Sequence, residues 1–156
     1  MLLATQDFDP IDDLGTLEAA PRALLAYWEK RRGERVMPAP AEIDPLDLAS
    51  NVLSFLTVID IESDPLDFRY RFVGTRVVEA AGVDRTGKRA SEIYNAETLE
   101  KIMAAIRAVL AAPGPVALRG RLDWLDREYR VFETVQLPLS HDGTTVTRVI
   151  GAYRFS

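Results

Sequence analysis

Few residues in this chain of 156 amino acids have side chains suited to catalysis, because it has one histidine and no cysteine. Without cysteine, the chain cannot form disulfides, thiolate metal ligands, a cysteine nucleophile or a cysteinyl flavin adduct. The histidine, His141, directly follows Ser140 in a predicted turn, where neighbouring side chains point apart, so no serine triad is indicated. A metal site would need oxygen ligands alone, and no acidic pair has the spacing of a metal-binding loop. The sequence therefore predicts neither nucleophilic catalysis nor a metal site.

Acid–base catalysis by carboxylates is the remaining chemistry, and Glu79, Glu92 and Glu133 are the acids that could line a pocket. Small cone-shaped isomerases and dehydratases use a histidine or a carboxylate in a deep apolar cavity. The scarcity of histidine counts against such an enzyme, and no pair of carboxylates stands out. We therefore expect a protein without catalytic activity and keep this small enzyme as the alternative. A cavity that holds an acid beside a second polar group would favour the enzyme.

Aromatic and basic residues alternate in the stretch 67–75, which we take as the centre of the fold. The alternation indicates a strand whose two faces carry Phe68, Tyr70 and Phe72 and, opposite, Arg69, Arg71 and Val73. If the aromatic side chains face the core, the arginines stay solvated, which avoids burying unpaired guanidinium groups. If the aromatic side chains instead pack beneath the N-terminal helix, Arg71 faces the pocket. Arg71 would then bind an anionic ligand through paired, charge-assisted hydrogen bonds.

The elements around this strand follow from helical spacing and turn residues. Gly74 ends the strand, and Gly82 closes the short helix after it in a left-handed conformation. Asn95 caps a longer helix, and an Asp-Gly turn at 142–143 joins the last two strands. The predicted order is helix 16–32, a proline-rich connector 36–45, a short helix 46–52, strands 55–61 and 67–73, short helices 75–81 and 90–94, helix 95–112, and strands 116–124, 129–137 and 145–155.

Composition indicates one globular domain, with 47% hydrophobic and 28% charged residues. The net charge of −5 and the pI of about 5.0 argue against a nucleic-acid partner. No apolar run approaches the length of a membrane span, and the first ten residues do not resemble a signal peptide. Because a chain without cysteine suits a reducing compartment, we expect a cytoplasmic protein that binds neither membrane nor nucleic acid.

This order of elements resembles a PAS domain, and more narrowly the short, often stand-alone bacterial PAS proteins. The stretch 69–75 followed by 82–88 carries the resemblance, together with Asp44-Pro45 before the first strand and the segment 137–140 before a glycine turn. These motifs are short and degenerate, and the specificity lies in their order. The resemblance covers about Ala23 to Phe155.

The resemblance implies an α+β fold with a five-stranded antiparallel sheet, helices on one face and a preceding N-terminal helix. The implied division is a flexible arm at 1–15, a helical extension at 16–53 and a PAS-like core at 54–156. A ligand pocket is expected between the concave face of the sheet and the helices. The expected ligand-binding residues are Tyr70, Arg71, Phe72, Val73, Thr75, Val78, Ile102, Ile106, Trp124 and Phe132.

Many PAS proteins dimerise through the helix that precedes the core. Here that helix carries an apolar stripe at helical spacing, which consists of Leu17, Leu24, Leu25 and Trp28. The stripe either packs on the sheet of a partner in a homodimer or covers the chain's own sheet. The sequence leaves both arrangements open.

The resemblance therefore predicts a non-enzymatic sensory module that binds a small ligand, a partner protein or both. Because no output domain fits in a chain of this length, the signal is expected to pass to a separate signalling protein by contact. The cofactor is unknown. Haem is disfavoured because His141 does not lie on a buried helix, and a metal or a covalent flavin adduct is disfavoured by the residues available. A structural adaptor without a ligand is a further alternative.

Overall fold

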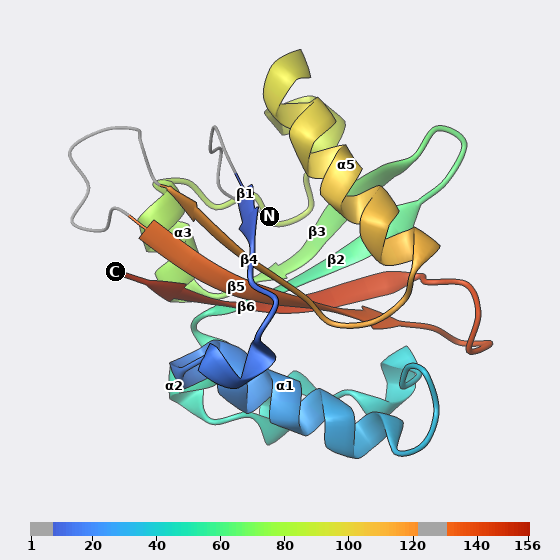
Figure 1. Ribbon diagram of the computed structural model, residues 1–156. Helices are drawn as coiled ribbons and strands as arrows, with labels where there is room; N and C mark the ends of the chain where they lie inside the picture. Colours follow the sequence, from blue (N-terminus) through green and yellow to red (C-terminus); the bar gives the residue numbers. More distant parts are fainter. Residues whose placement is uncertain (1–7, 122–130) are drawn as a thin grey trace.

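An antiparallel sheet of six strands lies between two helical layers in the computed structural model, which describes residues 8–121 and 131–156 (Figure 1). The strand order is β1-β4-β5-β6-β2-β3. The strands are β1 (Phe8–Pro10), β2 (Leu56–Glu62), β3 (Asp67–Val73), β4 (Val116–Arg121), β5 (Val131–Leu139) and β6 (Arg148–Phe155). The α-helices are α1 (Ala19–Arg32), α2 (Ser50–Leu53), α3 (Thr75–Ala81), α4 (Ala90–Ile93) and α5 (Ala96–Ala111).

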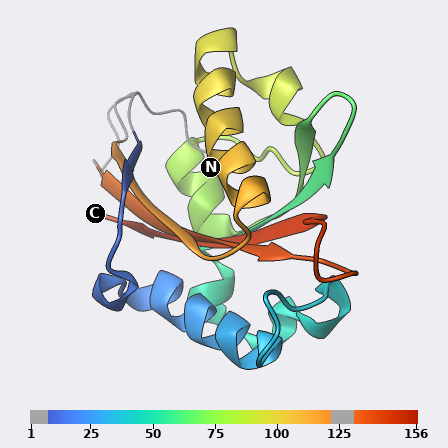
Figure 2. The same ribbon diagram turned by 45° about the vertical axis from the view of Figure 1, so that its right-hand side comes forward.

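The predicted α+β class and PAS-like architecture are confirmed, with two corrections. The sheet has six strands rather than five, and helices cover both of its faces rather than one. Figures 1 and 2 show α5 on one side of the sheet and α1 and α2 on the other. We call these sides the α5 face and the α1 face.

The helices of the α5 face begin and end at the residues that the sequence indicated. The side-chain oxygen of Asn95 accepts a hydrogen bond from the Thr98 amide at 2.9 Å, which caps the first turn of α5. Gly82 ends α3 with a φ of 80°, a conformation that favours glycine. Ile102, Ile106 and Val109 of α5 are fully buried. These residues lie on the side of α5 that packs into the core.

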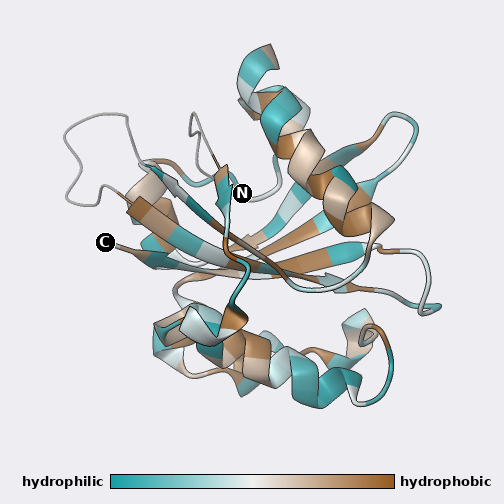
Figure 3. Ribbon diagram, in the orientation of Figure 1, coloured by the Kyte–Doolittle hydropathy of each residue, from teal (hydrophilic) through white to brown (hydrophobic). Residues whose placement is uncertain are grey.

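The apolar stripe of α1 covers the chain's own sheet, which is the second of the two arrangements left open by the sequence. Leu17, Leu24 and Trp28 are 0–1% exposed, and Leu25 is half-buried. The indole nitrogen of Trp28 donates a hydrogen bond to the backbone oxygen of Pro138 in β5. The last turn of α1 carries Lys30, Arg31 and Arg32, and Figure 3 shows this end of the helix as hydrophilic. The burial of Trp28 fixes α1 against β5.

Residues 8–10, which we predicted as part of a loose arm, form the edge strand β1. It pairs antiparallel with β4, with Phe8 opposite Gly120. The ring of Phe8 packs edge-on against Phe132 at 6.3 Å between centroids. Gly120 accommodates Phe132, because a Cβ at that position would overlap the Phe132 ring. This strand is the sixth of the sheet, and its pairing explains the first correction.

A β-bulge in β3 corrects the expectation that its alternation is strict. Val58 of β2 pairs with Phe72, but the next residue, Ile59, pairs with Tyr70, so Arg71 is an extra residue in β3. Phe68 and Tyr70 are therefore buried on the α5 face, whereas Phe72 is half-buried on the α1 face. Neither arrangement proposed from the sequence describes the whole strand, because each assumed that all three rings share a face.

The loop between β5 and β6 is longer than the predicted turn. The carboxylate of Asp142 accepts hydrogen bonds from the amides of Thr144 and Thr145, both at 2.8 Å, and from the hydroxyl of Ser140. These bonds hold the pKa of Asp142 at about 2.

Among the described residues, none of the helices is both long and apolar enough to cross a membrane.

Candidate functional site

A pocket of about 370 Å³ opens on the α1 face between the sheet and the segment that follows α1. We call it the outer pocket. Its floor is apolar and comes from four neighbouring strands, through Val58 of β2, Phe72 of β3, Leu139 of β5 and Ile150 of β6. Its wall consists of Pro40, Ile43 and Pro45, and two arginines complete the lining, Arg71 and Arg148. The bulge in β3 builds this site, because it turns Phe72 onto the α1 face.

The wall of the outer pocket is held in two short 3₁₀ turns, Pro40–Glu42 and Pro45–Asp47. Proline starts each turn with a suitable φ, and the Asp44 carboxylate caps the second turn by accepting from the Leu46 amide at 2.9 Å. Arg35 donates two hydrogen bonds of 2.6 Å to the Glu42 carboxylate, which also accepts from the Ala39 amide. These bonds lower the pKa of Glu42 to about 2.

The same wall is attached to the last two turns of α1. The hydroxyl of Tyr27 accepts from the Asp44 amide at 3.1 Å and donates to Asp47 at 2.9 Å. Arg31 also donates to the Asp47 carboxylate at 3.1 Å. We call these contacts, together with the pair Arg35–Glu42, the latch. Because the latch connects α1 to the wall, a movement of the wall is expected to reach α1.

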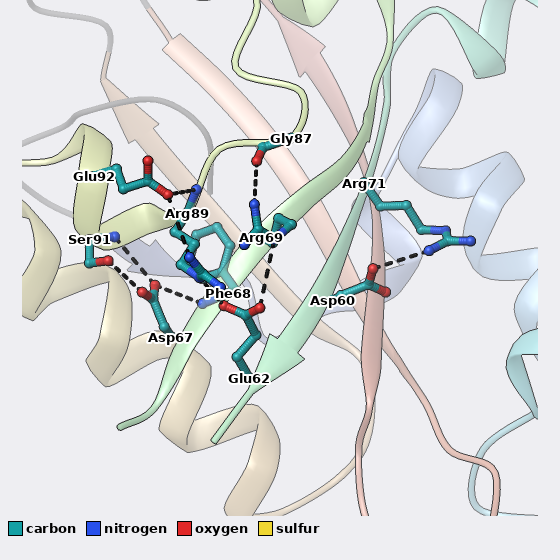
Figure 4. Close-up of polar contacts among 10 residues, drawn as sticks. All are labelled: Asp60, Glu62, Asp67, Phe68, Arg69, Arg71, Gly87, Arg89, Ser91 and Glu92. Atoms are coloured by element: carbon teal, nitrogen blue, oxygen red, sulfur yellow. Dashed lines mark hydrogen bonds and ion pairs between the residues drawn. The ribbon is translucent and has the colours of Figure 1, made fainter. Parts of the chain in front are cut away.

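Two arginines at the outer pocket share one carboxylate. Arg148 donates from Nε to Oδ1 of Asp60 at 2.7 Å, and Arg71 donates from Nη1 to Oδ2 at 3.3 Å. Asp60 and Arg148 are about a quarter to a third exposed, whereas Arg71 is 57% exposed. Figure 4 shows Arg71 extending from β3 to Asp60. The site carries two positive charges and one negative charge, so one positive charge is in excess.

The other arginine of β3 has a different environment, which Figure 4 also shows. Arg69 donates to the backbone oxygen of Gly87 at 2.6 Å and forms an ion pair with Glu62. Arg89 donates to the same Glu62 carboxylate at 2.6 Å. These contacts hold the segment before α4 along the edge of β3. Arg69 therefore stabilises the fold, while Arg71 is left at the outer pocket.

A family model for a PAS domain matches residues 17–154. The chain belongs to the PAS domain family. Among solved structures, it is similar to a sensory box histidine kinase/response regulator from Burkholderia thailandensis E264, with 12% identity and a TM-score of 0.41. That match covers 65% of this chain and 77% of the other.

A second solved structure, an RNA-binding light-oxygen-voltage receptor, is 17% identical with a TM-score of 0.49. The match covers 98% of this chain but 39% of the receptor chain, so this PAS domain spans well under half of it. No curated protein sequence matches the chain. The family assignment rests on the family model, and the predicted resemblance to PAS domains is confirmed.

The α5 face of this PAS domain contains four of the residues predicted to bind ligand, namely Tyr70, Ile102, Ile106 and Phe132. All four are 0–1% exposed and form part of the core. The Tyr70 and Tyr94 hydroxyls lie 2.7 Å apart, and burial raises the pKa of Tyr70 and brings that of Tyr94 to about 12. Beside them, the Gln136 side chain donates to the Thr134 hydroxyl at 2.8 Å.

The remaining predicted ligand-binding residues are divided among different places. Arg71 and Phe72 line the outer pocket, and Val73 and Thr75 line a shallower pocket of about 320 Å³ beside α2. Val78 is half-buried on α3. Trp124 lies outside the described residues. The predicted set therefore does not form one site.

Sequence reasoning missed most of the outer pocket of this PAS domain. Asp60 and Arg148 are 88 positions apart, and no local pattern connects them. Sequence reasoning did name Arg71 as a residue that could face a pocket, and Arg71 lines this one. A third pocket, of about 470 Å³, lies beside Ala19, Phe55 and Phe155. None of these three pockets is lined by an aspartate, a glutamate or a histidine.

Proposed function

We propose that this PAS domain is a sensory module that binds a small molecule in the outer pocket and signals to another protein by contact, without catalysing a reaction. The observation that carries the proposal is the outer pocket itself, an apolar site with two arginines at its edge. Its volume of about 370 Å³ lies within the range of small-molecule sites. A largely apolar lining with a few converging polar groups is typical of such sites.

The latch supplies a route from the pocket to the surface of α1. A ligand shifts a conformational equilibrium only when it binds one arrangement better than the other. A ligand that touches Pro40, Ile43 and Pro45 would favour the wall position that fits it. Because Tyr27 and Arg31 connect that wall to α1, the favoured position would change how the end of α1 is presented. A partner protein could read that change without any covalent chemistry.

None of the three pockets has the feature that would favour the alternative, a small isomerase or dehydratase. Such an enzyme places an acid or a histidine inside its cavity. The carboxylate of Asp60 beside the outer pocket has both of its oxygens engaged, Oδ2 by Arg71 and Oδ1 by Arg148. That arrangement suits charge recognition better than proton transfer.

The homodimer expected from the sequence remains part of the proposal, but through a different surface. Leu17, Leu24 and Trp28 are covered by the chain's own sheet, so a dimer would use the outward side of α1 or other exposed residues. Native mass spectrometry tests this part. A monomer over the whole accessible concentration range would contradict it, and the ligand proposal would be unaffected.

A thermal-unfolding screen with neutral and charged small molecules tests the proposed function. A ligand at 100 times its Kd adds about 2.7 kcal/mol to stability, which for a chain of this size raises Tm by roughly 5–10 °C. The variant Ile43→Trp fills the outer pocket, and Val83→Trp, on an exposed residue of another loop, is the matched control.

We expect compounds that stabilise the wild type and Val83→Trp but not Ile43→Trp. If every stabilising compound acts equally on Ile43→Trp, the outer pocket is not the sensory site. If no compound stabilises the wild type, the adaptor without a ligand becomes the better account.

A further inference from the structure

The charges around the outer pocket indicate the class of its ligand, and this inference rests on the proposed function of that pocket. We infer that the outer pocket binds an amphipathic carboxylate, a molecule with a short apolar body and one negative charge. Three features lead to this ligand: the charge balance at the pocket edge, the unused donors of the two arginines, and the apolar floor.

The charge balance favours a single negative charge on the ligand. Arg71 and Arg148 contribute two positive charges, and Asp60 contributes one negative charge. Among the acids of the wall, Glu42 is bound to Arg35 and Asp47 to Arg31. The third, Asp44, accepts from the Leu46 amide and does not line the pocket. One ligand carboxylate would neutralise the site. A second negative charge would have no partner and would lie close to Asp60.

The two guanidinium groups retain donors for such a carboxylate. Each guanidinium has five N–H donors in a planar fork. Within residues 8–121 and 131–156, Arg148 uses Nε alone and Arg71 uses Nη1 alone, both on Asp60. The other nitrogens of both groups are therefore left for a ligand, and a carboxylate accepts paired hydrogen bonds from a guanidinium. Asp60 holds both arginines in place and thus positions these donors.

The floor of the pocket accounts for the apolar body of the ligand. Phe72 is half-buried in the protein alone, so a ligand on it would remove further apolar surface from water. Val58, Leu139 and Ile150 continue the floor, and Pro40 covers its edge. A ligand with only a charged group would leave this surface exposed. A ligand with only an apolar body would leave the arginine donors unused.

The class of ligand can be tested with four probes that share an octyl or octanoyl chain: octanoate, octanamide, octylamine and octyl phosphate. Isothermal titration calorimetry at pH 7 measures each Kd on the wild-type protein. We expect octanoate to bind at least tenfold more tightly than octanamide, and octylamine not to bind. Equal affinities for octanoate and octanamide would overturn the carboxylate assignment and leave a pocket for apolar ligands, so the proposed function would stand.

Four variants locate the charge recognition. Arg71→Gln and Arg148→Gln should each weaken octanoate about tenfold and leave octanamide unchanged. Arg76→Gln is the matched control, because Arg76 is 56% exposed and pairs with Glu79 at 3.2 Å, much as Arg71 pairs with Asp60. Asp60→Asn should strengthen octyl phosphate more than octanoate, since it raises the excess positive charge.

If Arg76→Gln weakens octanoate as much as Arg71→Gln does, the anion is recognised by the general surface charge and the inference is wrong. If none of the four probes binds the wild type, the inference is also wrong. The proposed function then fails only if the screen with Ile43→Trp fails as well.

Discussion

The indole nitrogen of Trp28 lies 3.0 Å from the backbone oxygen of Pro138 and donates a buried hydrogen bond to it across 110 positions of the chain. Trp28 is 1% exposed, so the contact is shielded from water. Pro138 belongs to β5, near the centre of the sheet. The contact makes α1 a part of the folded domain rather than a detachable extension.

Trp28→Ala should therefore lower the free energy of unfolding by about 3–5 kcal/mol, the usual cost of removing a large aromatic side chain from a core. Trp28→Phe keeps most of the volume but leaves the Pro138 oxygen without its donor, at a cost of roughly 1–3 kcal/mol. Urea unfolding followed by circular dichroism measures both values. A loss below about 1 kcal/mol for Trp28→Ala would show that α1 is only loosely attached.

The bulge at Arg71 predicts that two phenylalanines of the same strand differ in their contribution to stability. Phe68 is fully buried on the α5 face, and its replacement by alanine should cost about 3–5 kcal/mol. Phe72 is half-buried at the outer pocket, so Phe72→Ala should cost roughly half as much, since less apolar area is lost. Chemical unfolding of the two variants side by side is the measurement. Equal losses would contradict the register described for β3.

A close contact between Gly151 and Gln136 leads to a prediction about a pair of variants. A Cβ at position 151 would overlap the amide of Gln136, which is itself held by the Thr134 hydroxyl. Gly151→Ala should cost about 1–3 kcal/mol through overpacking. In a Gln136→Ala background the same substitution should cost much less, because the obstructing amide is gone. Additive effects in the double-mutant cycle would mean that the two residues do not meet.

The latch has a pH dependence that follows from the lowered pKa of Glu42. Its pKa is about 2 in the folded chain against an ordinary value of 4.5, mainly because Arg35 donates to it. A lowered pKa stabilises the fold above the ordinary value, and this stabilisation is lost as the pH falls from 4.5 towards 2. Because the pair is exposed, the clearest readout is the carboxyl carbon of Glu42 in an NMR titration.

In that titration, the wild-type midpoint for Glu42 should lie near 2, and Arg35→Gln should move it up towards the ordinary value. Asp142 is an internal control, since its pKa of about 2 comes from the turn after β5 and is independent of Arg35. A Glu42 midpoint that stays the same in Arg35→Gln would contradict the latch.

Local patterns predicted the parts of the fold that depend on neighbours in sequence. The Gly82 end of α3 and the Asn95 cap of α5 both follow from the residue type at the end of a helix. The three residues of β1 gave no such pattern, because a strand of that length is defined only by its partner β4. The sequence also could not decide what covers the apolar stripe of α1. The same apolar residues are needed whether the stripe packs on the chain's own sheet or on the sheet of a partner.

The candidate site was less predictable than the fold because long-range pairing builds it. The position of Phe72 depends on how β3 aligns with β2, and a shift by one residue moves a side chain to the other face of a sheet. The pair Asp60–Arg148 exists because β2 lies beside β6. Sequence reasoning placed the ligand on the α5 face, where Tyr70, Ile102 and Ile106 are packed core residues.

The most direct test of the central proposal, a ligand site on the α1 face, is an NMR titration of the labelled protein with octanoate. The account predicts that backbone amide signals of Phe72, Leu139 and Ile150 shift with a common Kd, while those of Ile102 and Ile106 in α5 stay in place. Shifts confined to α5 and to the strand residues beneath it would contradict the account.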